Sequence, residues 1–272
     1  MPTTQSPSAL PASADPHLPI ETYLFSEAET EKLAGAGAVL RKACLQRFGL
    51  DYAVSPAGPQ TGPRTFTDRR YGVTDQAEVA ANGYHLGDRD PRTHPVHPTQ
   101  FSAEQQQVLT GHLPGKTGAD DTKFEVNGVP VPPGGCYEEA KRGLAGSGEL
   151  GPSSVAQQAN FQTFKASTSA PQVTQAFEAW SGCMRNKGYS YPSPMDAISD
   201  PRFLGDSPTP LEIQVATADV TCKQQVDLIA TWLAVEASLQ KELIARQPAE
   251  FAAALAAKTE ELAKADAVLR DR

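Results

Sequence analysis

The chain has 272 residues, enough for one or two domains of ordinary size. Hydrophobic residues make up 39% of it and aromatic residues only 7%, which permits a modest core, and 23 prolines with 21 glycines indicate long irregular stretches. The net charge of −8 argues against a nucleic-acid-binding protein, which needs a basic surface, and no apolar run approaches the roughly 18 residues that span a bilayer.

Residues 1–22 predict a flexible tether. They are rich in Pro, Ser, Ala and Thr, and they have neither the cationic start nor the apolar core of a secretory signal. Such a tether often lies between an export signal and a folded domain. It is also typical of a disordered cytoplasmic N-terminus, so both interpretations stay open.

Residues 23–148 predict a loop-rich helical unit. Ser26 and Glu29 have the spacing of a capping box, which predicts a helix that runs to about Phe48.

Dense Pro, Gly and Asp predict an irregular stretch over residues 51–100, with one short helix near residues 75–81. A second short helix is expected to begin at Ser102 and to end at Gly111.

Residues 124–131 predict the only β-hairpin of this half. Asn127-Gly128 is a typical two-residue hairpin turn, because both residues tolerate a positive φ. A short helix that carries Cys136 is expected to follow and to end near Gly143.

Residues 149–272 predict a helical bundle, so we expect a domain boundary at residues 146–154, which read GSGELGPSS. Thr209 to Glu212 give a strong helix start with proline at the first helical position, and Pro248 interrupts the helix that follows. The predicted helices of this half cover about residues 154–165, a stretch from residue 171, residues 210–246, and the end of the chain after residue 248.

The chain has four cysteines, none in a CxxC pair and none at metal-ligand spacing from a histidine. An even number with long spacings favours two disulfides and an oxidising compartment, and four cysteines allow three connectivities. The alternative is four buried free thiols in a cytoplasmic protein.

Two stretches of the chain read C-x4-G-x2-Y, one from Cys44 to Tyr52 and the other from Cys183 to Tyr191. Each is expected to end a helix, and each is followed by a later cysteine in a helical context. The simplest account is two related units, each closed by one disulfide, with the pairs Cys44–Cys136 and Cys183–Cys222. Closing such loops stabilises a chain by roughly 4–5 kcal/mol per bridge.

Loops that carry exposed aromatic and cationic side chains are frequent binding sites. The alternative is that these tyrosines cover loop ends and form hydrogen bonds with the backbone. The candidate recognition residues are Arg69, Arg70, Tyr71, Tyr84, Tyr52 and Tyr191.

The stretch from Trp180 to Ala197, and residues 218–222 with the helix that follows, resemble a group of exported proteins and lipoproteins of actinobacteria. Residues 44–49 and 69–72 are similar to the same group, so the resemblance covers most of residues 20–270. No activity, cofactor or catalytic residue is established for the group, so the resemblance implies none here. It implies an export signal, which the first residues of this chain do not show.

We therefore expect a mainly α protein with two disulfides that is secreted or associated with the cell envelope. It would bind a protein or envelope partner through residues 51–135 or its C-terminal helices, with no catalytic residue, cofactor or metal. One alternative is a secreted hydrolase that acts on an envelope or polymeric substrate, with His85, His94 or His112 beside a carboxylate in a deep pocket. Another is a cytoplasmic protein with free thiols.

Overall fold

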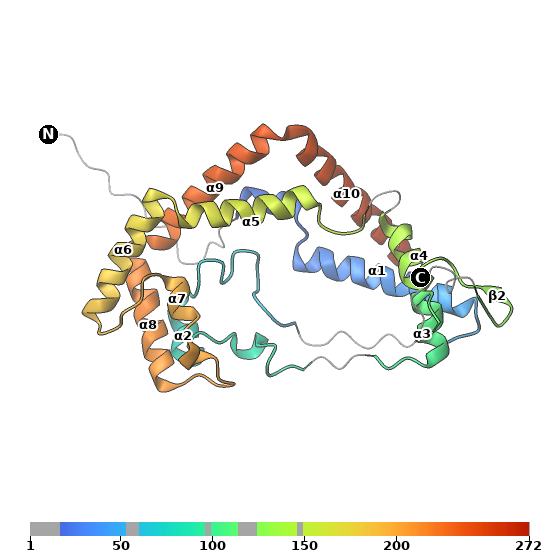
Figure 1. Cartoon of the computed structure of the whole chain (residues 1–272), viewed down its shortest axis with the longest axis horizontal. Helices are drawn as coiled ribbons and strands as arrows, with labels where there is room; N and C mark the ends of the chain where they lie inside the picture. The colour runs from blue at the N-terminus through green and yellow to red at the C-terminus, as the bar shows by residue number, and fades with distance from the viewer. Residues whose placement is uncertain (1–16, 53–59, 96–98, 114–123, 146–148, 272) are drawn as a thin grey trace. The chain divides into compact units, whose positions relative to one another are not determined.

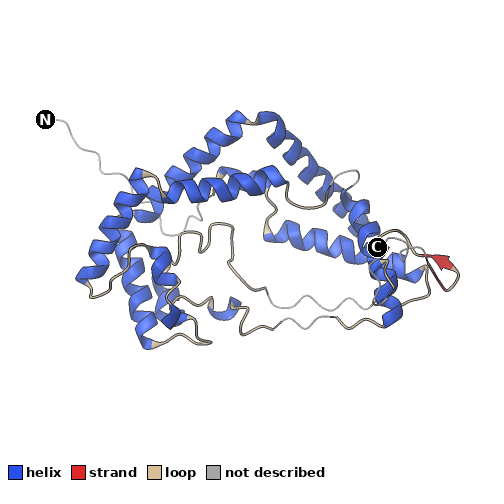
Figure 2. Cartoon of the chain, viewed as in Figure 1, coloured by secondary structure: helices blue, strands red, loops and turns tan. Residues whose placement is uncertain are grey.

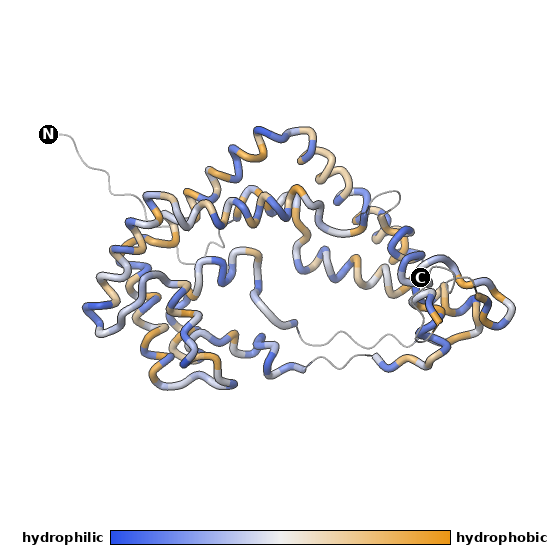
Figure 3. The backbone as a smooth tube through the Cα atoms, viewed as in Figure 1, coloured by the Kyte–Doolittle hydropathy of each residue, from blue (hydrophilic) through white to orange (hydrophobic). Residues whose placement is uncertain are grey.

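The computed structural model describes residues 17–52, 60–95, 99–113, 124–145 and 149–271. These residues form ten α-helices and one two-stranded antiparallel sheet, so the predicted mainly α fold is confirmed (Figures 1 and 2). Along the helices the backbone alternates between apolar and polar residues, as expected when one face of each helix is buried (Figure 3).

The helices of the first half are α1 (Glu27–Gln46), α2 (Gln76–Asn82), α3 (Ala103–Thr110) and α4 (Gly135–Ala145). The strands are β1 (Glu125–Val126) and β2 (Val129–Pro130). The helices of the second half are α5 (Ser154–Thr168), α6 (Pro171–Asn186), α7 (Pro194–Ile198), α8 (Pro210–Gln225), α9 (Leu228–Arg246) and α10 (Pro248–Arg270).

The helix starts that the sequence predicts are confirmed in their local chemistry. The hydroxyls of Ser26, Ser102 and Thr209 each accept a hydrogen bond from the backbone three residues later, and each forms a complete capping box. The hairpin turn has φ values of 52° at Asn127 and 74° at Gly128, as its sequence requires.

The prediction of one helix over residues 210–246 is wrong, because α8 ends at Gln225 and α9 begins at Leu228. The break occurs at Asp227, whose φ of 49° places it in the left-handed region and stops the helical hydrogen-bond pattern. Aspartate tolerates that conformation better than most residues, so the break needs neither glycine nor proline.

Contacts divide the chain into two compact units, each built from segments that are not consecutive in sequence. Unit 1 contains residues 1–21, 59–95 and 158–246, and unit 2 contains the remaining residues, 22–58, 96–157 and 247–272.

This division differs from the consecutive units 23–148 and 149–272 that the sequence suggests. Residues 149–154 of the expected linker lie within segment 96–157 of unit 2, and residues 146–148 lie outside the described residues. Of the predicted tether, residues 1–16 also lie outside them, whereas Leu18 and Ile20 are buried.

The core of unit 1 surrounds two tryptophans. Trp180 on α6 and Trp232 on α9 are fully buried, and α6 packs against both α8 and α9. The rings of Tyr71, Phe164 and Phe177 surround Trp232 at centroid distances of 4.9 to 5.6 Å. The disulfide Cys183–Cys222 joins α6 to α8, as predicted.

Unit 2 consists of α1, α3, α4, α10 and the hairpin. Its disulfide, Cys44–Cys136, joins α1 to α4 as predicted, and both cysteines belong to a core with Leu45, Phe48 and Leu109. The C-terminal helix α10 packs against α1 and α4.

Candidate functional site

The predicted recognition patch is not an exposed patch. Tyr71 is only 2% exposed, Tyr84 8% and Tyr191 9%, because each tyrosine is part of the core of unit 1 and its hydroxyl donates to a carboxylate. The structure therefore corrects the idea of a surface patch and is closer to the alternative of buried tyrosines, although their partners are carboxylates and not backbone groups.

Arg70 and Tyr71 converge on one buried carboxylate, that of Glu236 on α9. The guanidinium of Arg70 contacts both oxygens of Glu236, and Nε donates to Oε2 at 3.1 Å. The hydroxyl of Tyr71 donates to the same Oε2 at 2.8 Å, and the amide of Gln240 donates to Oε1 at 3.1 Å. A second donor of Arg70 reaches the side-chain oxygen of Asn160 at 2.8 Å.

The guanidinium of Arg70 also lies between two aromatic rings. Its central carbon is 4.9 Å from the ring centroid of Phe66 and 4.9 Å from that of Phe164. A planar guanidinium suits this arrangement, because it stacks on rings while its edge forms hydrogen bonds. A lysine at this position would lose the planar stacking between the rings and the simultaneous contact with both oxygens of Glu236.

A second buried cluster surrounds Asp219 on α8. Its carboxylate accepts hydrogen bonds from Lys223 Nζ at 3.0 Å, from Trp180 Nε1 at 2.9 Å and from the hydroxyl of Tyr84 at 3.3 Å. Lys223 Nζ also donates to the carbonyl oxygen of Val73 at 2.9 Å. Burial raises the pKa of Asp219 and lowers that of Lys223, and their mutual attraction opposes both shifts.

The third cluster places His85 between two carboxylates. Its Nδ1 is 3.4 Å from Asp90 Oδ2, and its Nε2 is 3.4 Å from Glu212 Oε1. The guanidinium of Arg92 lies 2.5 Å from Nδ1 of the same ring. Glu212 also accepts from the backbone N–H of Tyr84 at 2.9 Å.

Arg69 fixes the backbone of this segment. Its guanidinium donates to the carbonyl oxygens of Tyr84 and His85 at 3.0 Å each, and it forms an ion pair with Glu78 at 3.0 Å. Because its side chain is only 10% exposed, Arg69 positions the loop and offers little surface to a partner.

Tyr191 forms hydrogen bonds with a separate ion pair of unit 1, Asp200 with Arg202. Its hydroxyl donates to Asp200 at 2.7 Å and accepts from Arg202 at 2.9 Å. Burial, and then the hydrogen bond to Asp200, raise the pKa of Tyr191 to about 12. Arg202 holds the pKa of Asp200 below its ordinary range.

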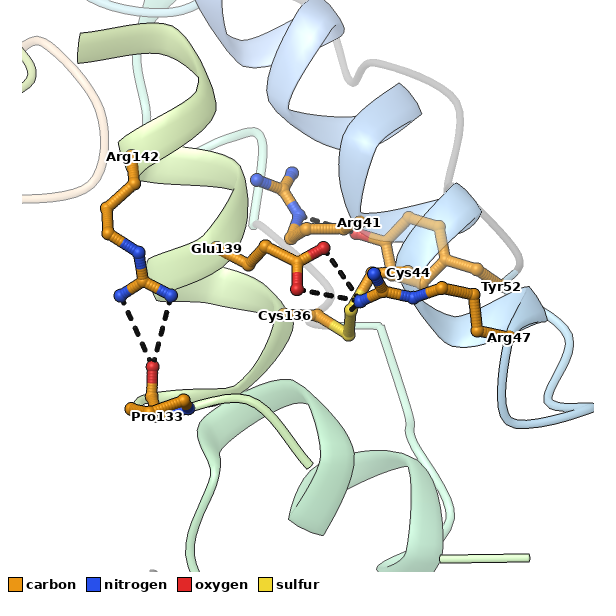
Figure 4. Close-up of a disulfide and its surroundings, with 8 residues drawn as sticks. All are labelled: Arg41, Cys44, Arg47, Tyr52, Pro133, Cys136, Glu139 and Arg142. Atoms are coloured by element: carbon orange, nitrogen blue, oxygen red, sulfur yellow. Dashed lines mark hydrogen bonds and ion pairs between the residues drawn. A yellow bond between two sulfur atoms is a disulfide. The ribbon is translucent and has the colours of Figure 1, made fainter. Parts of the chain in front are cut away.

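The last predicted patch residue, Tyr52, belongs to unit 2, where it lies near the disulfide (Figure 4). Its hydroxyl accepts from Arg41 Nε at 3.2 Å, and its ring stacks on Phe101 at a centroid distance of 5.9 Å.

Beside the disulfide of unit 2, Arg47 Nη2 is 3.1 Å from Cys44 Sγ and 2.7 Å from both carboxylate oxygens of Glu139.

The three clusters in unit 1 fasten residues 69–92 onto α8 and α9. The carboxylates that receive this segment are fully buried, which sequence analysis did not predict for Glu212, Asp219 or Glu236. A signal was present: Glu212, Asp219 and Lys223 recur at helical spacing on the same face of α8 as apolar residues. Charged residues on an apolar stripe indicate buried ion pairs.

The described residues were also compared with the requirements of a metal site and of a membrane-spanning helix. Within the described ranges, no three His, Cys, Asp or Glu side chains gather in a way that would hold a metal ion. Of the helices the structure describes, none combines the length and the apolar character that crossing a bilayer demands.

Comparison with known proteins adds no assignment. No protein-family model matches the chain, and neither a curated protein nor a solved structure is significantly similar to it.

Proposed function

We propose that the protein works outside the cytoplasm, secreted or held at the cell envelope, and binds a protein or envelope component without catalysing a reaction. The two disulfides carry this proposal, because they leave none of the four cysteines free and such bridges persist in oxidising compartments. The same bridges weigh against the alternative of a cytoplasmic protein with free thiols.

The polar residues of unit 1 support binding over catalysis. The carboxylates and arginines of the three clusters are occupied with one another, which leaves partner contacts to exposed side chains. Among these, Leu204 is 66% exposed and Leu211 40% exposed.

These two leucines border a loop that is held at its start. Phe203 is buried and stacks on Tyr84 at a centroid distance of 5.7 Å, and Arg92 donates to the carbonyl oxygen of Gly205 at 2.8 Å. These contacts at its start limit the entropy that the loop loses on binding. We therefore assign the partner contact to residues 204–211.

Site-specific photo-crosslinking in intact cells tests this assignment. A photoreactive amino acid at Leu204 is expected to give a discrete crosslinked species. The same amino acid at Leu255, a 39% exposed leucine on α10, is the control and is expected to give none. Equal products at both positions, or none at either, would contradict the assignment.

Alkylation tests the compartment. The natively isolated protein, unfolded in the presence of an alkylating agent, is expected to gain mass only after prior reduction. Reaction of all four cysteines without reduction would place the protein in a reducing compartment and remove the main support for the proposal.

The hydrolase alternative has one observation in its favour, the histidine that lies between Asp90 and Glu212. His85 is only 5% exposed, so a substrate would reach it only after the segment opened. Turnover of an envelope polymer that His85→Gln abolishes, with an unchanged unfolding midpoint, would favour the hydrolase over the binding protein.

A further inference from the structure

The two disulfides lie in opposite electrostatic surroundings. Cys136 is in the first turn of α4, where the positive end of the helix dipole stabilises a thiolate. Cys183 and Cys222 are in the last turns of α6 and α8, where the negative end of each dipole disfavours one.

The side chains beside the sulfurs strengthen this contrast. Cys44 is in the last turn of α1, but the guanidinium of Arg47 lies 3.1 Å from its Sγ (Figure 4). This cation opposes the roughly half negative charge of the helix end, and the carboxylate of Glu139, 2.7 Å from the same nitrogen, weakens its effect on the sulfur. In the other bridge, Cys183 Sγ has the amide oxygen of Gln225 at 2.9 Å, a partial negative charge.

We propose that Cys44–Cys136 is the reducible bridge of this chain, a lock on unit 2 that a dithiol opens while Cys183–Cys222 stays oxidised. In the reaction, one thiolate of the dithiol bonds to one sulfur of the bridge, and the S–S electron pair leaves with the other cysteine. The second thiolate then displaces the bound cysteine. The dithiol is oxidised to a disulfide, and the two cysteines are reduced. Stabilised thiolates make a disulfide easier to reduce.

Exposure alone predicts the reverse order. Cys44 and Cys136 are 2% and 0% exposed, whereas Cys183 is only partly buried and a reductant reaches it more readily. Burial slows the attack of a thiolate but does not set the equilibrium, so the two explanations are separated by measuring at equilibrium.

The experiment is a redox titration of the oxidised full chain. The protein is equilibrated at neutral pH with mixtures of reduced and oxidised dithiothreitol, quenched with acid, and alkylated, and each cysteine peptide is then quantified. Cys44–Cys136 is expected to be half reduced at a reduced-to-oxidised ratio about tenfold lower than Cys183–Cys222, which corresponds to about 30 mV. Equal midpoints, or the reverse order, would overturn the proposal.

Two variants distinguish this electrostatic effect from simple loss of an ion pair, because both break the contact between Arg47 and Glu139. Arg47→Gln removes the cation and is expected to lower the equilibrium constant for reduction about threefold or more. Glu139→Gln frees the guanidinium for the Cys44 thiolate and is expected to raise the constant. Shifts in the same direction would show that the ion pair acts only structurally.

Arg142→Gln serves as the control, because Arg142 is on α4 like Glu139 but its guanidinium donates to the carbonyl oxygen of Pro133 and not to a residue of the bridge (Figure 4). In this variant, the reduced-to-oxidised ratio at which Cys44–Cys136 is half reduced is expected to stay within about twofold of the wild-type value.

Opening of the lock has its own readout. Both tryptophans belong to unit 1, so their emission is expected to remain constant while amide exchange in α4 accelerates. Unchanged exchange in α4 after reduction of Cys44–Cys136 would show that the bridge does not hold unit 2 closed.

Discussion

At the scale of single residues, the main feature of unit 1 is charge in the core. Glu236, Asp219 and Lys223 are at most 1% exposed, and each has several hydrogen-bond partners. A buried pair of this kind adds little net stability compared with apolar residues, but removing one partner leaves an uncompensated charge. The clusters therefore act by specifying where residues 69–92 must lie.

We predict that Glu236→Gln lowers the free energy of unfolding by about 3–5 kcal/mol, because Arg70 then stays buried without a counter-charge. Urea denaturation followed by tryptophan fluorescence measures the loss. Asp88→Asn, which removes an exposed partner of Arg64 in the same unit, is the control and is expected to change stability by less than about 0.5 kcal/mol. Similar losses in both variants would contradict a special role for the buried carboxylate.

We predict that stability falls as the pH drops below about 4. Arg202 and Arg92 hold the pKa values of Asp200 and Asp90 below the ordinary range, to which they return in the unfolded chain. At a pH between the folded-state pKa and the unfolded-state pKa of these aspartates, the unfolded chain binds more protons than the folded one. Lowering the pH through this range therefore favours unfolding. Urea midpoints measured from about pH 5 to about pH 2 are expected to fall less in Asp90→Asn/Asp200→Asn than in the wild type.

At the scale of elements, local signals explain most helix starts, since a capping hydroxyl and its partner lie only three residues apart. The break at Asp227 was missed because no glycine or proline marks it, and because the apolar stripe continues from α8 into α9. The buried carboxylates were missed for a related reason. A charged residue on a helix face is normally solvated, and only its distant partners, such as Arg70 for Glu236, show otherwise.

We predict that Asp227→Val destabilises unit 1 by about 1–2 kcal/mol, whereas Asp227→Gly is neutral or stabilises it by up to about 1 kcal/mol. The reason is the positive φ at this position, which a β-branched residue resists and glycine adopts freely. Thermal and urea unfolding measure both variants. Asp206 is the control position, because its φ is not positive. There the glycine variant is not expected to be more stable than the valine variant.

At the scale of the whole molecule, the sequence predicted both disulfide pairs but not the composition of the units. Cysteine parity and the repeated C-x4-G-x2-Y pattern are visible along the chain. The packing of residues 59–95 with 158–246 cannot be seen in the sequence. It depends on contacts between residues more than a hundred positions apart, such as Lys223 with Val73.

We predict that the two bridges stabilise different units. Cys183→Ala/Cys222→Ala is expected to lower the tryptophan-detected stability by roughly 4 kcal/mol, because both tryptophans and this bridge belong to unit 1. Cys44→Ala/Cys136→Ala is expected to leave that transition nearly unchanged. An equal shift in both variants would mean that the units unfold together.

The alternation of segments between the units has a consequence for biosynthesis. A chain made from its N-terminus presents residues 59–95 long before α8 and α9 exist, and α1 before the α10 that packs on it. Arg69 and Arg70 must then remain hydrated, and the apolar side of α1 uncovered, until late in synthesis. Neither unit can mature on a half-made chain, so the order of folding follows completion of the polypeptide and not the order of its elements.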